Sequence, residues 1–107
     1  MKPPKNLDLK QDRFSKARGG KSTVLLITCK KCGEDLAVYQ KDGPGPLKRL
    51  YLDRLVEPTT VAGELVCKSC KKQVGIPYIY RDEKRPALLV EIDSVVTKVI
   101  PKNTYGR

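Results

Sequence analysis

The residues of this 107-residue chain best suited to chemistry are its four cysteines, which form two Cys-x-x-Cys pairs. Cys29 and Cys32 make the first pair, and Cys67 and Cys70 make the second. A Cys-x-x-Cys turn points both sulfur atoms at one place, so two such turns brought together can surround one ion with four thiolates. Each pair lies between two predicted strands. The spacing therefore predicts one structural Zn²⁺ per chain, bound by all four cysteines.

Other chemistries of paired cysteines fit the sequence less well. Two disulfides would need an oxidising compartment, and the N-terminus lacks the apolar segment of a secretory signal. A thioredoxin-like redox site would need one pair at the start of a helix in a βαβ unit, where strands are predicted instead. Iron in a rubredoxin-like site has suitable ligands, but Gly follows both pairs in rubredoxins. Here Gly33 follows the first pair and Lys71 the second. Zinc is the leading interpretation, with iron, redox chemistry and disulfides as alternatives.

The chain is strongly basic, and the charge is uneven. It carries 22 Lys and Arg against 12 Asp and Glu, for a net charge of +10, and it has no His. Residues 1–22 hold seven of the basic and two of the acidic side chains. Such a segment favours an anionic partner, nucleic acid before a membrane surface, because no apolar helical face accompanies the charge. The alternative is a solubilising tail without contacts.

The segment 1–21 has few large apolar residues, so we predict a disordered arm. Residues 102–107 are predicted to be a flexible C-terminus. Between them, residues 22–101 alternate in short β-branched and apolar runs, which predict an all-β, antiparallel domain too small for its apolar core to suffice alone. Pro77 predicts an edge position or a bulge. The predicted strands cover 22–28, 36–39, 47–56, 61–66, 74–80, 88–93 and 95–100, and residues 47–56 also have helical spacing.

Two cysteine pairs on hairpins, far apart in sequence, resemble the zinc-ribbon and β-tent (Mss4-like) group of folds. The stretch from Cys29 through Gly33 and on to the segment 40–49, with its sequence QKDGPGPLKR, also resembles small microbial zinc-ribbon proteins. The resemblance covers residues 25–80 at most. It implies a structural zinc site and a role as a nucleic-acid or protein docking module. Methionine-sulfoxide reductases of that group use a further catalytic Cys and His residues, which this chain lacks, so their activity is not expected.

No other motif predicts catalysis. Gly20-Lys21-Ser22 is the end of a P-loop pattern, but Ser15 stands where its first Gly belongs, and a strand rather than a helix follows. The loop from Asp42 to Arg49 could hold a phosphate, because glycines allow close backbone approach and two cations follow. An ordinary rigid hairpin loop is the alternative. Three tyrosines could stack on unpaired bases or pack in the core: Tyr51, Tyr78 and Tyr80.

These observations predict a non-enzymatic, cytoplasmic zinc protein that binds RNA or a ribonucleoprotein surface. The predicted nucleic-acid contacts come from the basic arm and from the loop: Lys10, Arg13, Lys16, Arg18, Lys21, Lys48 and Arg49. The arm would supply most of the electrostatic affinity. The first alternative is a protein–protein adaptor that docks through its zinc ribbon, and a thiol redox protein is the remote one. Neither a membrane nor a small-molecule substrate is expected.

Overall fold

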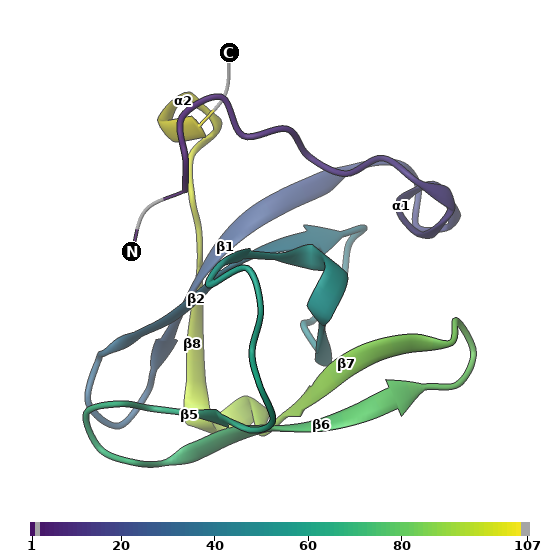
Figure 1. Ribbon diagram of the computed structural model, residues 1–107. Coiled ribbons are helices and arrows are strands. Elements are labelled where there is room, and N and C mark those ends of the chain that lie inside the picture. Colours follow the sequence, from purple (N-terminus) through teal and green to yellow (C-terminus); the bar gives the residue numbers. More distant parts are fainter. Residues whose placement is uncertain (2, 106–107) are drawn as a thin grey trace.

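Two four-stranded antiparallel sheets make up the body of the protein (Figure 1). The computed structural model describes Met1 and residues 3–105. Sheet A has the strand order β4 (Leu55–Glu57), β2 (Asp35–Asp42), β1 (Ser22–Cys29), β8 (Val95–Val99). Sheet B has the order β3 (Arg49–Tyr51), β7 (Arg85–Val90), β6 (Gln73–Tyr80), β5 (Leu65–Val66). The predicted all-β, antiparallel class is confirmed.

The main core lies between the sheets and includes two of the cysteines. Buried side chains alternate along β1, where Leu25, Ile27 and Cys29 share one face. Cys67, at the end of β5, is also fully buried. The two cysteine pairs therefore begin inside the core. The buried residues of this core are Ile27, Cys29, Leu36, Ala37, Tyr39, Leu50, Leu55, Leu65, Cys67, Val74, Leu88 and Val90.

The segment 47–56, predicted as one strand, is two short strands separated by a turn. The 3₁₀ turn η1 (Leu52–Arg54) follows β3 and precedes β4. β3 pairs with β7 in sheet B, whereas β4 pairs with β2 in sheet A. The chain crosses from one sheet to the other here, which explains why its apolar residues match neither a pure helical nor a pure strand period.

The β6–β7 hairpin extends sheet B beyond its short edge strand. Pro77 lies opposite Leu88 in β7, while β5 reaches only Gln73 and Gly75 of β6. Pro77 has no N–H to donate, and it lies in the part of β6 that β5 does not cover. This part of β6 is therefore a free edge, as predicted.

The predicted disorder of the arm is wrong. Residues before β1 run across sheet A and form the short helix α1 (Arg13–Ala17), above the β6–β7 hairpin in Figure 1. Leu7 and Leu9 pack on the outer face of sheet A against Val24 and Val38, which are both fully buried. The few apolar residues of the arm are sufficient because sheet A presents an apolar face that needs a cover.

A buried arginine also holds the arm to the body. The side chain of Arg54, 2% exposed, donates to Asp12 at 2.6 Å and to Asp42 at 2.9 Å. Asp12 is the N-cap of α1 and accepts from the backbone N–H groups of Phe14 and Ser15. The guanidinium lowers the pKa of Asp12 below its usual value of 3.8, because hydrogen bonding favours the charged carboxylate.

The C-terminal part follows β8 into the short helix α2 (Lys102–Tyr105), after the 3₁₀ turn η2 (Ile92–Ser94) that joins β7 to β8. Residues 106–107, part of the predicted flexible C-terminus, lie outside the described residues. No helix within the described chain has the length and apolar character needed to cross a membrane.

We predict that Asp12→Ala releases the arm while the body stays folded. The variant loses the helix cap and one partner of Arg54, at a cost of about 1–3 kcal/mol. Limited proteolysis and amide exchange should show faster cleavage and exchange in residues 1–20. Lys16→Ala, an exposed change on the same helix, is the control. Because the folded pKa of Asp12 is lowered, its contribution is full above about pH 4 and declines as the pH falls below that value. Unchanged exchange in Asp12→Ala would contradict the role of this contact.

Candidate metal centre and adjoining cationic pocket

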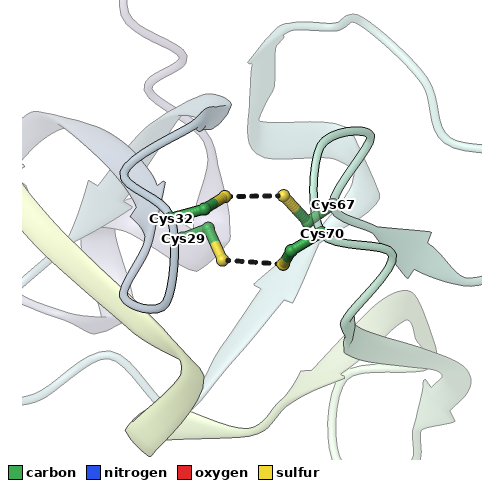
Figure 2. Close-up of side chains that lie close together, drawn as sticks. All are labelled: Cys29, Cys32, Cys67 and Cys70. Carbon is green, nitrogen blue, oxygen red and sulfur yellow. Dashed lines mark hydrogen bonds between the residues drawn. The ribbon is translucent and has the colours of Figure 1, made fainter.

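The four cysteine sulfurs form one cluster between the two sheets (Figure 2). Cys29 is the last residue of β1 and Cys32 lies in the β1–β2 connection of sheet A, while the other pair comes from the β5–β6 connection in sheet B. The Sγ atoms of Cys29 and Cys70 lie 3.6 Å apart, those of Cys32 and Cys67 lie 3.4 Å apart, and all four lie within 4.8 Å of one another. Zn–S bonds of about 2.3 Å in a tetrahedron place sulfurs about 3.8 Å apart. The cluster could therefore hold one metal ion, and its four thiolates suit zinc.

The two cysteine pairs have the same backbone fold. In the first, Cys29 N–H donates to the carbonyl of Glu34 at 2.8 Å, and Gly33 N–H donates to Cys29 O at 2.7 Å. In the second, the equivalent bonds run from Cys67 N–H to Lys72 O and from Lys71 N–H to Cys67 O, both at 2.9 Å. The two turns therefore match over six residues each, 29–34 and 67–72. The cluster is thus built from two copies of one turn, facing each other across the gap between the sheets.

The residue after each pair has a left-handed backbone. Gly33 has φ +78° and Lys71 has φ +64°. The two pairs are followed by different residues, unlike the pairs of rubredoxins, but these two residues have the same backbone conformation. Lys71 adopts a conformation that glycine favours, and its Nζ donates to Lys68 O at 2.9 Å, which closes the turn.

The turns also direct backbone amides at sulfur. The N–H of Glu34 lowers the pKa of the Cys32 thiol to about 7 in the metal-free protein. A thiolate is the form that binds metal, so this amide favours the liganding state.

The lysines of the cysteine pairs are exposed, and Lys72 forms an ion pair with Glu91 at 3.6 Å. The exposed lysines are Lys30, Lys31, Lys68, Lys71 and Lys72.

The structure gives the basic residues of the arm definite places. Lys10 Nζ donates to the Asp53 carbonyl at 2.5 Å, and Arg18 forms a bidentate ion pair with Glu83 at 2.9 Å. Arg13 lies over the ring of Phe14, 4.8 Å from its centroid. Two further cations of the arm, Lys16 and Lys21, are exposed.

The loop cations lie beside Arg18 rather than apart from the arm. Arg49 lines the same cavity as Arg18 and Lys48, between the loop and the end of β2. The cavity has a volume of about 330 Å³. The structure thus brings together three of the seven predicted nucleic-acid contacts. The cavity is lined by Arg18, Tyr39, Lys41, Asp42, Pro44, Gly45, Pro46, Leu47, Lys48, Arg49 and Tyr51.

Gly43 is the reason the loop can approach the arm. Its φ is +74°, and a Cβ there would lie 2.8 Å from both the Cβ and the carbonyl oxygen of Arg18. Its N–H also donates to Lys21 O at 2.8 Å. Only glycine fits this close approach, so Gly43 fixes the position of Arg18 at the cavity wall.

Arg49 is held by tyrosines of sheet B. Its Nε donates to the hydroxyl of Tyr78 at 2.7 Å, and its guanidinium lies 4.1 Å from the ring centroid of Tyr80. Tyr78 and Tyr80 are half-buried, whereas Tyr51 is almost fully buried. Neither Arg49 nor Lys48 pairs with a carboxylate among the residues that the structure describes.

Sequence reasoning missed Tyr39, Lys41 and Arg54. The pattern gave no sign that Tyr39 and Lys41 of β2 line a cavity, because their partners are far along the chain. A signal for the docked arm did exist. Asp12 followed by Ser15 is a helix-start pattern, and the structure shows their reciprocal capping bonds.

Comparisons with known proteins give no relative. No family model, no curated protein and no solved structure matches this chain. Its function is therefore inferred from its own residues.

We predict opposite effects of substitution at the two equivalent turn positions. Lys71→Gly removes left-handed strain and should raise the free energy of unfolding by up to about 1 kcal/mol, whereas Gly33→Ala introduces the strain and should lower it by about 1–2 kcal/mol. Urea unfolding of the metal-loaded protein measures both. Lys68→Gly, in the same turn at a residue without positive φ, is the control. A stabilising Gly33→Ala would contradict the equivalence of the turns.

Proposed function

We propose that the protein is a zinc-stabilised, non-enzymatic RNA-binding domain of the zinc-ribbon or β-tent type. The metal assignment is supported by four cysteine sulfurs within 4.8 Å of one another, since thiolate ligands favour Zn²⁺ among common divalent ions and the cluster contains no imidazole or carboxylate. Four thiolates complete the coordination shell, as in structural rather than catalytic zinc sites.

Zinc removal should unfold the body. Structural zinc contributes on the order of 10–16 kcal/mol in finger peptides, comparable to or above the whole stability of a small domain, about 5–15 kcal/mol. Native mass spectrometry should find one zinc per chain, and chelation should abolish the near-ultraviolet circular dichroism. Cys70→Ser should bind zinc more weakly, with Thr59→Ala, an exposed change away from the cluster, as the control. A well-folded metal-free protein, or iron in the purified protein, would contradict the assignment.

The RNA assignment rests mainly on Arg49. This side chain has no carboxylate partner among the described residues, and two tyrosines hold it in place next to Lys48. An ordered cation without a counter-ion suits a phosphate, and half-buried tyrosines on the same face of sheet B suit the stacking of an unpaired base. Because the arm is docked and Lys10 and Arg18 are engaged, the cavity replaces the arm as the proposed centre of binding.

We expect single-stranded RNA to bind in a salt-dependent way. If Lys48 and Arg49 each contact one phosphate, the double variant Lys48→Ala/Arg49→Ala should flatten the log-affinity versus log-salt slope by about 1.4. The matched control Lys98→Ala/Lys102→Ala removes the same charge from another part of the surface and should change the slope far less. Fluorescence anisotropy with a labelled oligoribonucleotide measures both.

Two results would point to other functions. If the cavity variant and the control variant weaken RNA binding equally, the binding depends on the overall positive charge of the protein and not on the cavity. No RNA binding, together with salt-insensitive capture of a protein, would make the protein–protein adaptor the better hypothesis.

A further inference from the structure

Two tyrosine hydroxyls at the cavity donate to no acceptor in the part of the chain that the structure describes. Tyr39 is 2% exposed, and its hydroxyl accepts from the Tyr51 N–H at 2.9 Å. The Tyr51 hydroxyl accepts from Arg18 at 3.1 Å and from Arg49 at 3.3 Å. A hydroxyl has two lone pairs and one proton, so the two guanidiniums fill the lone pairs of Tyr51 and leave its proton to donate. Among the described residues, neither hydroxyl donates to anything.

The cavity is therefore rich in donors. The hydroxyl protons of Tyr39 and Tyr51 join the N–H groups of Arg49 and the ammonium groups of Lys41 and Lys48. Burial raises the pKa of Tyr39, so its hydroxyl stays protonated and a donor. A ligand rich in acceptor oxygens would complement these donors, because each oxygen could accept from a group that lines the cavity.

The charge balance of the cavity is positive. The one carboxylate in its wall, Asp42, is already used: it accepts from Arg54 at 2.9 Å, from Ser22 at 2.6 Å and from Gln40 at 2.9 Å. Arg18 is balanced by Glu83. Lys41 Nζ donates to the Gly43 carbonyl at 2.7 Å.

The three remaining cations, Lys41, Lys48 and Arg49, have no carboxylate partner within the described chain. Arg18 and Arg49 also approach one oxygen, the Tyr51 hydroxyl, so their like charges repel. An anion beside this hydroxyl would relieve that repulsion.

The size and charge of the cavity favour a phosphate at the end of an RNA strand over a phosphate within the strand. A volume of about 330 Å³ holds a group the size of one nucleotide. An internal phosphodiester has a single charge and two free oxygens. A terminal phosphate monoester has a charge of about −1.5 to −2 and three acceptor oxygens, which match three unpaired cations and two hydroxyl donors.

We propose that this cavity binds the terminal phosphate monoester of an RNA strand, with Tyr51 and Arg49 donating to its oxygens and Lys41 and Lys48 balancing its charge. This inference rests on the proposed RNA-binding function and specifies which part of the RNA the cavity recognises.

The test compares one oligoribonucleotide in three forms: 5′-phosphorylated, 3′-phosphorylated and with hydroxyls at both ends. The metal-loaded protein should bind one phosphorylated form about tenfold more tightly than the hydroxyl form. Arg49→Ala should reduce this ratio to about one, and Tyr51→Phe should reduce it in part. Arg81→Ala, an exposed arginine in the β6–β7 turn, is the matched control and should keep the full ratio. Near-ultraviolet circular dichroism confirms that each variant is folded.

Three outcomes would overturn the inference. Equal affinity for all three forms would refute recognition of an end and leave RNA binding intact. A phosphorylated preference that survives in Arg49→Ala would place the recognition outside this cavity. A nucleoside monophosphate or inorganic phosphate that competes as strongly as the phosphorylated RNA would refute both the RNA end and the proposed function, because the site would then serve a small phosphate ligand.

Discussion

The contact on which the rest of the structure depends is the cluster of four sulfurs between sheet A and sheet B. Cys29 and Cys67 are fully buried at the ends of strands from different sheets, and two equivalent turns bring their sulfurs together with those of Cys32 and Cys70. A chain of this length buries a limited apolar core, so a bond network across the core has a large effect on its stability. With a metal ion in the cluster, the two sheets are joined at one end by coordination bonds and along their inner faces by packing.

The opposite face of sheet A shows how a basic segment with few apolar residues becomes ordered. Leu7 and Leu9 cover Val24 and Val38, and Arg54 joins Asp12 of the arm to Asp42 of β2. The second Arg54 bond matters because a buried guanidinium with one partner would be costly. The ordering also places Arg18 at the cavity, through the close approach that Gly43 permits. The arm therefore builds part of the cationic pocket instead of acting as a free polybasic tail.

The pocket combines residues that satisfy each other only in part. Arg49 is fixed by Tyr78 and Tyr80, and Tyr51 receives hydrogen bonds from both Arg18 and Arg49. These contacts order the cations without neutralising them, because tyrosines accept hydrogen bonds but carry no negative charge at neutral pH. The cations of this pocket are ordered and lack a balancing negative charge. The lysines around the cysteines differ, because ionised cysteines nearby would balance their positive charge.

The sequence by itself determined the cysteine cluster and the antiparallel β class, because both depend on local patterns: a two-residue gap between cysteines and a period of two in apolar residues. The likeness of the two cysteine turns was not visible in the sequence, because Lys71 stands where the first turn has Gly33. The tertiary structure alone decided the rest. The segment 47–56 divides because its halves pair with different sheets, the arm is ordered because a distant apolar face and a buried Arg54 accept it, and the cavity exists because Arg18, Tyr39 and Arg49 meet from three separate elements. Such contacts join residues far apart in sequence, and no local period records them.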